Sequence, residues 1–451
     1  MALDTLEVFG VEYTGVAGIK ATDDNDQIKT YIRPQGTKSI SANGTGIDVT
    51  SYASVDVAVS GGGGSVPKKQ INFIDYDGTI LYSYTKTEWQ SVSSLPSNPS
   101  HSGLTAQGWN WTKVQIDAQL TAMPDGDIWV GQMYVTTSGD TEIDVHFADA
   151  TRLNPILTIA VNGTITVDWG DNTTPDTVTG TSLSTRQAVS HTYAVAGDYM
   201  MIIHVVSGSF QFYGSTSYTL LRKNATINEN RVYANCVQAV RFGSGVTSIG
   251  YYAFYCCYSL ASVTIPSSIT SIGVSVFSSC CSLASVTIPS SVTSISSNAF
   301  FNCYSLTSVT IPGSVTSIST GAFSYCYILT SVTIPSGVTS IDNGIFNSCS
   351  SLASVTIPSD VTTISNNVFS YCYSLASVTI PSSVTSIGNS AFSYCYGMAE
   401  YHILPTTPPT LGTTAFDYIV SDCKIYVPSA SLSTYQGASN WSAYASYMVG
   451  E

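Results

Sequence analysis

Charged side chains are scarce in this chain. They make up 10% of the 451 residues, and the formal net charge is −14, whereas about a quarter of an average globular protein is charged. Proteins that bind nucleic acid or anionic membranes usually present a basic face, so this acidic balance argues against both kinds of partner. No apolar run reaches the roughly 18 residues that a membrane span needs, so we expect no membrane insertion.

The N-terminus also lacks the features of an export signal. The first twenty residues carry Asp4, Glu7 and Glu12 and contain no continuous apolar core. We therefore expect no signal peptide and no export by that route.

Charged residues and histidines are almost missing from the segment between Gly243 and Met398. Between Gly243 and Met398 the charged residues are Asp342 and Asp360, without any His, Lys, Arg or Glu. General acid–base catalysis needs groups that titrate near the working pH, so we expect no active site there and no enzyme.

The five histidines of the chain never fall at the close Cys/His spacing that zinc sites use, so we predict no metal site and no cofactor. They are His101, His146, His191, His204 and His402. Asp168 and Asp171 are interpreted as turn-capping carboxylates, with calcium binding as the less favoured alternative.

A repeat dominates residues 246–398. Phenylalanine, leucine and proline each recur with a fixed period of about 23 residues, in units that read L-x-S-V-T-I-P, then V-T-S-I, then F-x-x-C. A fixed period of this length predicts a solenoid, and proline is expected to end the S-V-T-I strand because it has no N–H to donate. The series are Phe254, Phe277, Phe300, Phe323, Phe346, Phe369 and Phe392; Leu260, Leu283, Leu306, Leu329, Leu352 and Leu375; and Pro266, Pro289, Pro312, Pro335, Pro358 and Pro381.

This pattern resembles the BspA-type leucine-rich repeat, whose hallmark is a proline-ended strand, a Val/Ile-containing strand and A-F-x-x-C. The resemblance implies a parallel β-solenoid and, commonly, adhesion or surface recognition. It does not name a ligand. Residues 399–451 look like the C-terminal cap that follows such arrays.

Shorter β modules are predicted before the repeats. Apolar and polar residues alternate in 1–59 around Asn-Gly turn signals, SGGGGS is a flexible linker by composition, and GWNWTKVQIDAQL is the one convincing place for a short helix. The fold class is therefore mainly β and multidomain. The predicted segments are a β attachment module at 1–59, a Gly-rich linker at 60–69, a mixed, mostly β module at 70–154, a PKD-like β-sandwich at 155–210, a connector at 211–230, the solenoid at 231–398 and the cap at 399–451.

Two further resemblances concern these modules. Residues 155–206 look like a PKD-type β-sandwich through VDWGD and HTYAVAGDY, with Asn172 where that family usually has glycine. Phrases within 37–60 and 70–140 are similar to modules of bacteriophage tail and baseplate-attached proteins of gut bacteria. That second resemblance implies other phage tail proteins as partners of the N-terminal modules.

The stretch FIDYDGT resembles the nucleophile motif of haloacid-dehalogenase-like phosphatases. In that interpretation Asp75 attacks phosphorus and Asp77 acts as general acid and base, and GDNTTPD at 170–176 resembles the magnesium motif. That family has a helix after the motif. Here an alternating strand, ILYSYT, follows and predicts a hairpin turn at Asp77-Gly78, so the phosphatase is kept only as a long shot.

One cysteine keeps its place in every repeat. A straight column of thiols cannot surround a metal ion, and side chains in register point the same way, which does not suit disulfides. We interpret these cysteines as buried apolar plugs, each with a weak donor for a turn carbonyl. They are Cys257, Cys280, Cys303, Cys326, Cys349, Cys372 and Cys395.

Beside that cysteine the residue types change from repeat to repeat, mostly among Tyr, Ser and Asn. These are the residues of binding loops, and the common charged surface residues are missing. We therefore predict a ligand-binding surface, the alternative being solvated loops that drift between duplicated units. Its members are Tyr255, Tyr258, Tyr304, Tyr325, Tyr327, Tyr371, Tyr373, Tyr394 and Tyr396.

Two hypotheses for function remain open. The first is a non-enzymatic receptor-binding protein of a phage tail, located in the virion, that presents the tyrosine surface to a host-cell surface protein or glycan. The alternative is a bacterial cell-surface adhesin of the BspA type.

Overall fold

The computed structural model describes residues 71–75, 79–122, 128–214, 220–222, 233 and 235–451, together with the backbone of six short strands before residue 57. The chain divides into two units, Met1–Pro67 and Lys68–Glu451, each of which is described by itself. Within the described residues, no helix has the length and apolar character needed to cross a membrane.

The first unit contains three antiparallel strand pairs. The strand β1 (Thr5–Val8) pairs with β2 (Val11–Thr14), β3 (Thr30–Ile32) with β6 (Ser54–Asp56), and β4 (Ser39–Ala42) with β5 (Thr45–Asp48). Ala42 faces Thr45, and the Asn-Gly dipeptide between β4 and β5 in the sequence lies outside the described residues.

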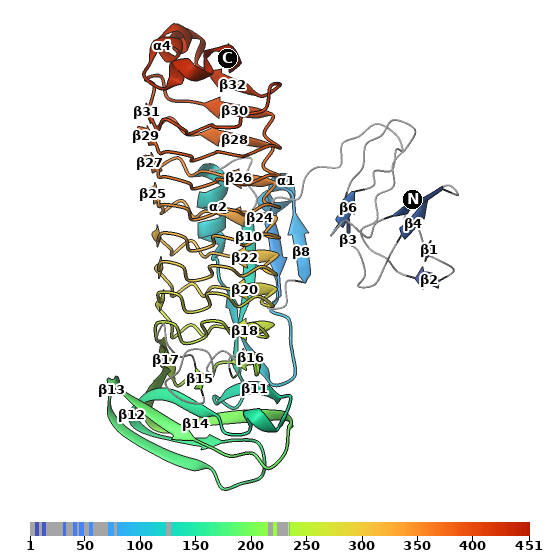
Figure 1. Cartoon of the computed structure of the whole chain (residues 1–451), viewed down its shortest axis with the longest axis vertical. Coiled ribbons are helices and arrows are strands. Elements are labelled where there is room, and N and C mark those ends of the chain that lie inside the picture. The colour runs from blue at the N-terminus through green and yellow to red at the C-terminus, as the bar shows by residue number, and fades with distance from the viewer. Residues whose placement is uncertain are drawn as a thin grey trace. The chain divides into compact units, whose positions relative to one another are not determined.

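The C-terminal half is a parallel β-solenoid, as the repeats predict (Figure 1). Each turn contributes one strand to a first row, which holds the S-V-T residues, and one to a second row, which holds the last residues of V-T-S-I. The first row is β16 (Val237–Arg241), β18 (Ser262–Thr264), β20 (Ser285–Thr287), β22 (Ser308–Thr310), β24 (Ser331–Thr333), β26 (Ser354–Thr356), β28 (Ser377–Ile380), β30 (Glu400–Ile403) and β32 (Lys424–Val427). The second row is β17 (Val246–Ile249), β19 (Ser271–Ile272), β21 (Ser294–Ile295), β23 (Ser317–Ile318), β25 (Ser340–Ile341), β27 (Thr363–Ile364), β29 (Ser386–Ile387) and β31 (Thr410–Leu411).

Successive turns pair in the register of the repeat. Ser285 of β20 lies opposite Ser308 of β22, and Ile272 of β19 lies opposite Ile295 of β21, so equivalent positions of neighbouring repeats face each other in both rows. The seven phenylalanines of the repeats stack on one another inside, with centroids 5.3–5.8 Å apart. Burying one such side chain contributes about 1.5–3 kcal/mol, and only neighbouring turns provide that burial.

An antiparallel sheet closes the N-terminal end of the stack (Figure 1). Its strands are β11 (Thr141–Phe147), β12 (Ile156–Asp168), β13 (Asp176–Ser190) and β14 (Gly197–Phe212), in the order β13-β12-β14-β11. The sheet continues into the first row because β16 is antiparallel to β11 and parallel to β18. The short elements η1 (Ala150–Arg152) and β15 (Leu221–Arg222) complete this region.

This arrangement joins segments that the sequence separates. β11, from the predicted 70–154 module, lies between β14 and the solenoid strand β16. The core residues Trp169 and Phe212 belong to the same apolar cluster as the solenoid phenylalanines. The likeness of 155–206 to a PKD-type sandwich stays a prediction.

The C-terminal end is closed by helices. β30, β31 and β32 extend the two rows into the predicted cap, and η2 (Ser429–Ser431), α4 (Leu432–Gly437), η3 (Trp441–Tyr447) and β33 (Met448–Gly450) follow (Figure 1). Trp441 and Tyr435 are fully buried and donate to the carbonyls of Pro409 and Pro405 over 2.7 Å.

Residues 71–136 form a small α/β module. Its strands β7 (Ile71–Ile74), β8 (Ile80–Tyr84), β9 (Leu104–Trp109) and β10 (Ile128–Thr136) are ordered β8-β7-β10-β9. The helix expected in GWNWTKVQIDAQL is α2 (Lys113–Ala122). Sequence reasoning missed α1 (Lys86–Gln90), although Thr85 and Glu88 form a capping box, which is a sequence-level signal of a helix start.

The module lies along the first row of the solenoid. Gly131 of β10 is needed for this approach, because a Cβ there would come within 2.5 Å of the Thr287 and Thr310 hydroxyls. The threonines of β18, β20, β22 and β24 are accordingly buried. The corresponding Thr379 of β28, farther along the stack, is exposed.

Three side chains of the module bond to successive turns of the solenoid. Asn110 donates to the carbonyl of Ile288 (2.9 Å), Trp111 to that of Ile311 (2.9 Å) and Gln119 to that of Ile334 (3.0 Å). Each of these isoleucines precedes a proline. In a parallel ladder its carbonyl would accept from the residue that follows the equivalent isoleucine one turn on, and that residue is a proline, which has no N–H. The module therefore supplies donors that the repeat itself lacks.

Gly131→Ala tests this docking. The added methyl collides with two buried threonines, so we expect the free energy of unfolding to fall by about 1–3 kcal/mol. Urea denaturation of the full chain measures it. Gly437→Ala, where a Cβ meets nothing within 4 Å, is the matched control and should leave stability within about 0.5 kcal/mol. Equal stability of the two variants would contradict the close contact of β10 with the solenoid.

Candidate functional site

Two columns of tyrosine rings run along the turns of the solenoid, one on each side of the repeated cysteine. The first tyrosine column, directly before the cysteine position, consists of Tyr325, Tyr371, Tyr394 and Tyr418. The second tyrosine column, directly after it, consists of Tyr304, Tyr327, Tyr373 and Tyr396.

The first column has left-handed backbone. Tyr325, Tyr371 and Tyr394 have φ values of 62–63°, which fits their hydrogen bonding, since the N–H of each donates to a carbonyl of the next turn over 2.8–3.1 Å. Ser348 takes the same conformation in its own turn. A residue with a Cβ pays roughly 1–2 kcal/mol there, and glycine would avoid the cost. The backbone conformation at this position therefore does not explain why the residue is tyrosine.

The rings of the first column stack face to face. Tyr394 lies 4.4 Å from Tyr371 and 4.0 Å from Tyr418, with interplanar angles of 8° and 19°. The rings of the second column are also parallel to each other, with 5.1 Å between Tyr304 and Tyr327 and 5.7 Å between Tyr373 and Tyr396. Such contacts add about 0.5–1.5 kcal/mol per pair beyond burial.

The two columns stand at right angles to each other. The interplanar angle is 88° between Tyr371 and Tyr373 and 89° between Tyr394 and Tyr396. The second-column rings stack on one another as well, more loosely than those of the first column, and 43% of Tyr373 and 50% of Tyr396 is exposed.

Serines interrupt both columns in one turn, at Ser348 and Ser350. The tyrosines consequently form two groups. The middle patch consists of Tyr304, Tyr325 and Tyr327, and the C-terminal patch consists of Tyr371, Tyr373, Tyr394, Tyr396 and Tyr418.

Seven of the nine predicted surface tyrosines belong to these patches. Tyr255 and Tyr258 lie in the first turn instead and are half-buried. Tyr258 holds the second-column position directly after Cys257 but is separated from Tyr304 by Cys281, and Tyr255 packs edge-on against Tyr252. The sequence analysis missed Tyr418. Its signal is the phrase AFDY at 415–418, which matches AFSY at 391–394 but follows it one position later than the repeat period predicts.

The structure places the seven repeated cysteines inside the stack, 0–3% exposed. Each Sγ from Cys280 onward donates to the carbonyl of a phenylalanine in the preceding turn, over 3.2–3.3 Å. All eleven cysteines of the chain are free thiols. Burial raises the pKa of Cys349 and of Cys395 to about 12, so these thiols stay protonated.

Native-state alkylation tests this placement of the thiols. We expect iodoacetamide to label Cys281 first, because Cys281 is the one cysteine that is only partly buried, while the seven repeated cysteines react only on unfolding. Mass spectrometry of the labelled peptides measures the order of reaction. Labelling of Cys372 as fast as Cys281 would contradict a buried column.

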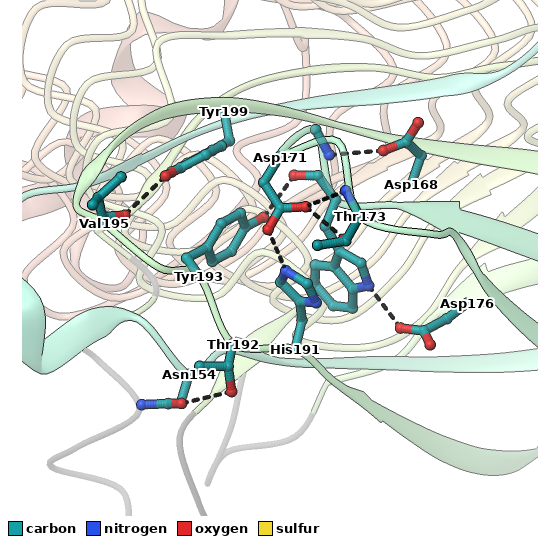
Figure 2. A network of polar contacts seen from close by, with 12 residues as sticks. Asn154, Asp168, Asp171, Thr173, Asp176, His191, Thr192, Tyr193, Val195 and Tyr199 are labelled. Atoms are coloured by element: carbon teal, nitrogen blue, oxygen red, sulfur yellow. Dashed lines mark hydrogen bonds and ion pairs between the residues drawn. The ribbon is translucent and has the colours of Figure 1, made fainter.

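Asp171, His191, Asp176 and Tyr193 belong to a network of polar contacts near the end of β12 (Figure 2). Trp169 lies within this network. His191 stacks on the indole, with centroids 4.8 Å apart, and its Nε2 pairs with Asp171 Oδ2 over 2.8 Å. Trp169 Nε1 donates to Asp176 (2.8 Å), and the Tyr193 hydroxyl donates to the Trp169 carbonyl (2.9 Å).

The expected turn-capping role of Asp168 and Asp171 is confirmed. Asp168 accepts from the Gly170 N–H over 2.9 Å, and Asp171 accepts from the N–H and hydroxyl of Thr173 over 3.2 and 2.6 Å. In the described part of the chain, no three His, Cys, Asp or Glu side chains gather as a metal site would require.

The structure around Asp75 differs from the one that the phosphatase interpretation requires. The strand β8 follows β7 as the second arm of an antiparallel pair, where the phosphatase family has a helix. Asp75 is buried, accepting from the Tyr134 hydroxyl (2.8 Å) and pairing with His101 Nε2 (2.7 Å). Both carboxylate oxygens are thus bonded within the module, which does not suit a nucleophile. Asp77 lies outside the described residues.

The Asp171 pair gives a pH-dependent contribution to stability. Burial acts to raise the pKa of Asp171, but hydrogen bonds from Thr173 and His191 outweigh it and hold the pKa below its usual value. A lowered folded-state pKa means that the contribution is present above the unfolded value of about 4 and is lost as the pH falls through the folded pKa.

Asp171→Asn should therefore lower the free energy of unfolding by about 1–2 kcal/mol at neutral pH, and by progressively less as the pH falls below about 4. Denaturation at a series of pH values measures this. Asp198→Asn is the control, since Asp198 also pairs with a histidine but is 87% exposed, and should change stability by less than about 1 kcal/mol. If the loss of stability in Asp171→Asn instead grew as the pH fell, the pKa of Asp171 could not be lowered in the folded protein.

The fold and surface described above define a leucine-rich repeat protein of the β-solenoid kind. The chain belongs to the BspA type leucine rich repeat family, whose sequence model matches residues 204–330 and 316–438 in six copies, just over half of the chain.

Several solved structures are similar to part of the chain. A leucine-rich repeat protein from Bacteroides ovatus shares 27% identity over 43% of this chain and 56% of its own length, with a TM-score of 0.38. The T. pallidum leucine rich repeat protein shares 32% identity over 36% of this chain and 78% of its own, with a TM-score of 0.34. A leucine rich cell surface protein from Faecalibacterium prausnitzii shares 28% identity over 44% and 76%, with a TM-score of 0.29.

This chain thus spans little more than half of the Bacteroides ovatus protein. The family is one of leucine-rich repeat proteins, a non-catalytic class of repeat protein, which fits a recognition role. No curated protein matches the chain.

Proposed function

We propose that this protein is a non-enzymatic recognition protein that binds a cell-surface ligand through the two tyrosine columns of its solenoid. The observation that carries the proposal is tyrosine in left-handed backbone at Tyr325, Tyr371 and Tyr394. Strained residues persist where the surrounding structure holds them in place, and they are concentrated at functional sites. Ser348 shows that the same turn forms without an aromatic ring.

Exposure and composition support the same surface. Tyr304, Tyr327, Tyr373, Tyr396 and Tyr418 are 39–58% exposed, and only Tyr418 has a charged neighbour in the sequence, Asp417. Tyrosine supplies rigid contact area with only two side-chain torsions to order, so a ligand that covers it loses little conformational entropy.

For the biological setting we propose a bacteriophage tail, with the N-terminal modules bound to other tail proteins and the solenoid directed at a host cell. The likeness of 37–60 and 70–140 to phage tail and baseplate-attached modules supports this. The alternative is a bacterial surface adhesin, in line with the Faecalibacterium prausnitzii relative, which is a leucine rich cell surface protein. Tail and lysis genes beside the gene support the phage setting, and an isolated surface-protein locus contradicts it.

The binding surface is tested by copying one turn of the protein onto others. Tyr371→Ser, Tyr373→Ser, Tyr394→Ser and Tyr396→Ser together give two turns the Ser-Cys-Ser sequence of residues 348–350, whose fold the structure already contains. We expect binding of the labelled full chain to a panel of gut bacterial cells to weaken by at least about tenfold, the scale of 1.4 kcal/mol.

Tyr426→Ser is the matched control. Tyr426 is a half-buried tyrosine of β32 outside both columns, stacked on His402, and its loss should leave cell binding unchanged. Thermal unfolding of both variants separates lost binding from lost fold. Unchanged binding by the folded quadruple variant would contradict the proposed surface.

A further inference from the structure

We infer that the ligand of the tyrosine columns is an uncharged glycan chain that lies along the solenoid and contacts both tyrosine patches at once. This inference rests on the proposed function and adds to it the chemistry and the orientation of the ligand.

Charge is the first argument. Between Gly243 and Met398 the chain contains no Lys, Arg or His, and its two carboxylates are Asp342 and Asp360. Phosphate, sulfate and carboxylate groups are recognised by arginine or lysine, so this surface has no donor set for an anionic sugar. A cationic ligand would find only two acidic groups over the whole segment. An uncharged ligand is what remains.

Residue type favours a glycan over a protein. Protein interfaces are anchored by Trp and Arg as well as Tyr, and they carry a polar rim. The segment 243–398 contains neither Trp nor Arg. A pyranose offers an apolar C–H face bordered by hydroxyl groups, which matches an amphipathic tyrosine ring with a hydroxyl at its tip.

Ring orientation fits a ligand that contacts mainly the second column. Rings of the first column cover each other's faces at 4.0–4.4 Å, so they offer edges and hydroxyls. Tyr373 and Tyr396 are turned by 88–89° relative to that column and are the more exposed members of their turns. These two rings stack on each other more loosely, at 5.7 Å, so more of each ring is available to a sugar, while the first column holds them in place by edge contacts.

The spacing of the patches makes ligand length decisive. Turns of a parallel solenoid lie about 4.8 Å apart, so the two turns from Tyr327 to Tyr373 separate the patches by about 10 Å. A disaccharide reaches one patch only. A longer chain reaches both, and its second contact is intramolecular, which raises affinity without any new kind of contact.

Treated cells identify the ligand class. Cells that bind the full chain are oxidised with periodate, which cleaves vicinal diols of sugars, or digested with proteinase K, and binding is then measured at low and at high salt. We expect periodate to abolish binding, proteinase K to leave it, and salt to have little effect, since screening weakens only interactions between charges. Loss of binding after proteinase K, with binding retained after periodate, would overturn the inference. So would a steep loss of binding with salt.

Fragments of the periodate-sensitive glycan test the orientation. Calorimetry with purified fragments of two to eight sugars should show affinity rising at least about tenfold once a fragment spans both patches. Tyr371→Ser with Tyr373→Ser should move that rise to longer fragments, because the nearest second-column tyrosines are then Tyr327 and Tyr396, three turns or about 14 Å apart. A length-independent affinity for the unchanged chain would overturn the two-patch arrangement.

The experiments test the tyrosine surface and the glycan ligand separately. Binding that depends on the column tyrosines but survives periodate overturns the glycan and leaves the recognition surface intact. Binding that does not depend on those tyrosines overturns the proposed function itself.

Discussion

Contact between successive turns in the register of the repeat is the constraint on which the other features depend. One turn exposes most of its phenylalanine, leucine and valine surface, and the next turn covers it. The same register lets each repeated thiol from Cys280 onward reach a phenylalanine carbonyl in the turn before, and lets the residue before it donate to the turn after. A side chain on the outside of a turn is free to vary because only its backbone takes part in these contacts, whereas the side chains of Cys372 and its equivalents take part directly.

Repetition also leaves backbone carbonyl groups without hydrogen-bond donors, and another part of the chain supplies some of these donors. Proline ends every S-V-T-I strand cleanly, but a proline in each turn leaves the preceding carbonyl without a ladder donor. Asn110, Trp111 and Gln119 supply three such donors, to Ile288, Ile311 and Ile334. Gly313 replaces the serine that most other turns carry after proline, and a Cβ there would lie 3.2 Å from the Trp111 ring. The repeat has thus been adapted locally to the module that covers it.

Much of the solenoid could be predicted from sequence because its contacts are periodic. The spacing of Phe, Leu and Pro gives the strand rows, and the invariant cysteine beside changing tyrosines separates interior from surface. The docked module could not be predicted, since its bonds join residues about 200 positions apart with no pattern between them. The left-handed backbone at Tyr371 could not be predicted from the sequence either, because tyrosine rarely adopts this conformation. Tyr418 was not predicted as part of the surface because one additional residue places it 24 rather than 23 positions after Tyr394.

We propose that the residues that change from turn to turn recognise the ligand, while the residues that stay the same build the fold. Oxidative footprinting of tyrosine side chains, on the full chain alone and bound to the cells it recognises, tests this most directly. The predicted result is protection of Tyr327, Tyr373 and Tyr396 on binding, with oxidation of Tyr426 on β32 unchanged. Protection of Tyr426, with the two columns as reactive as in the free protein, would contradict it.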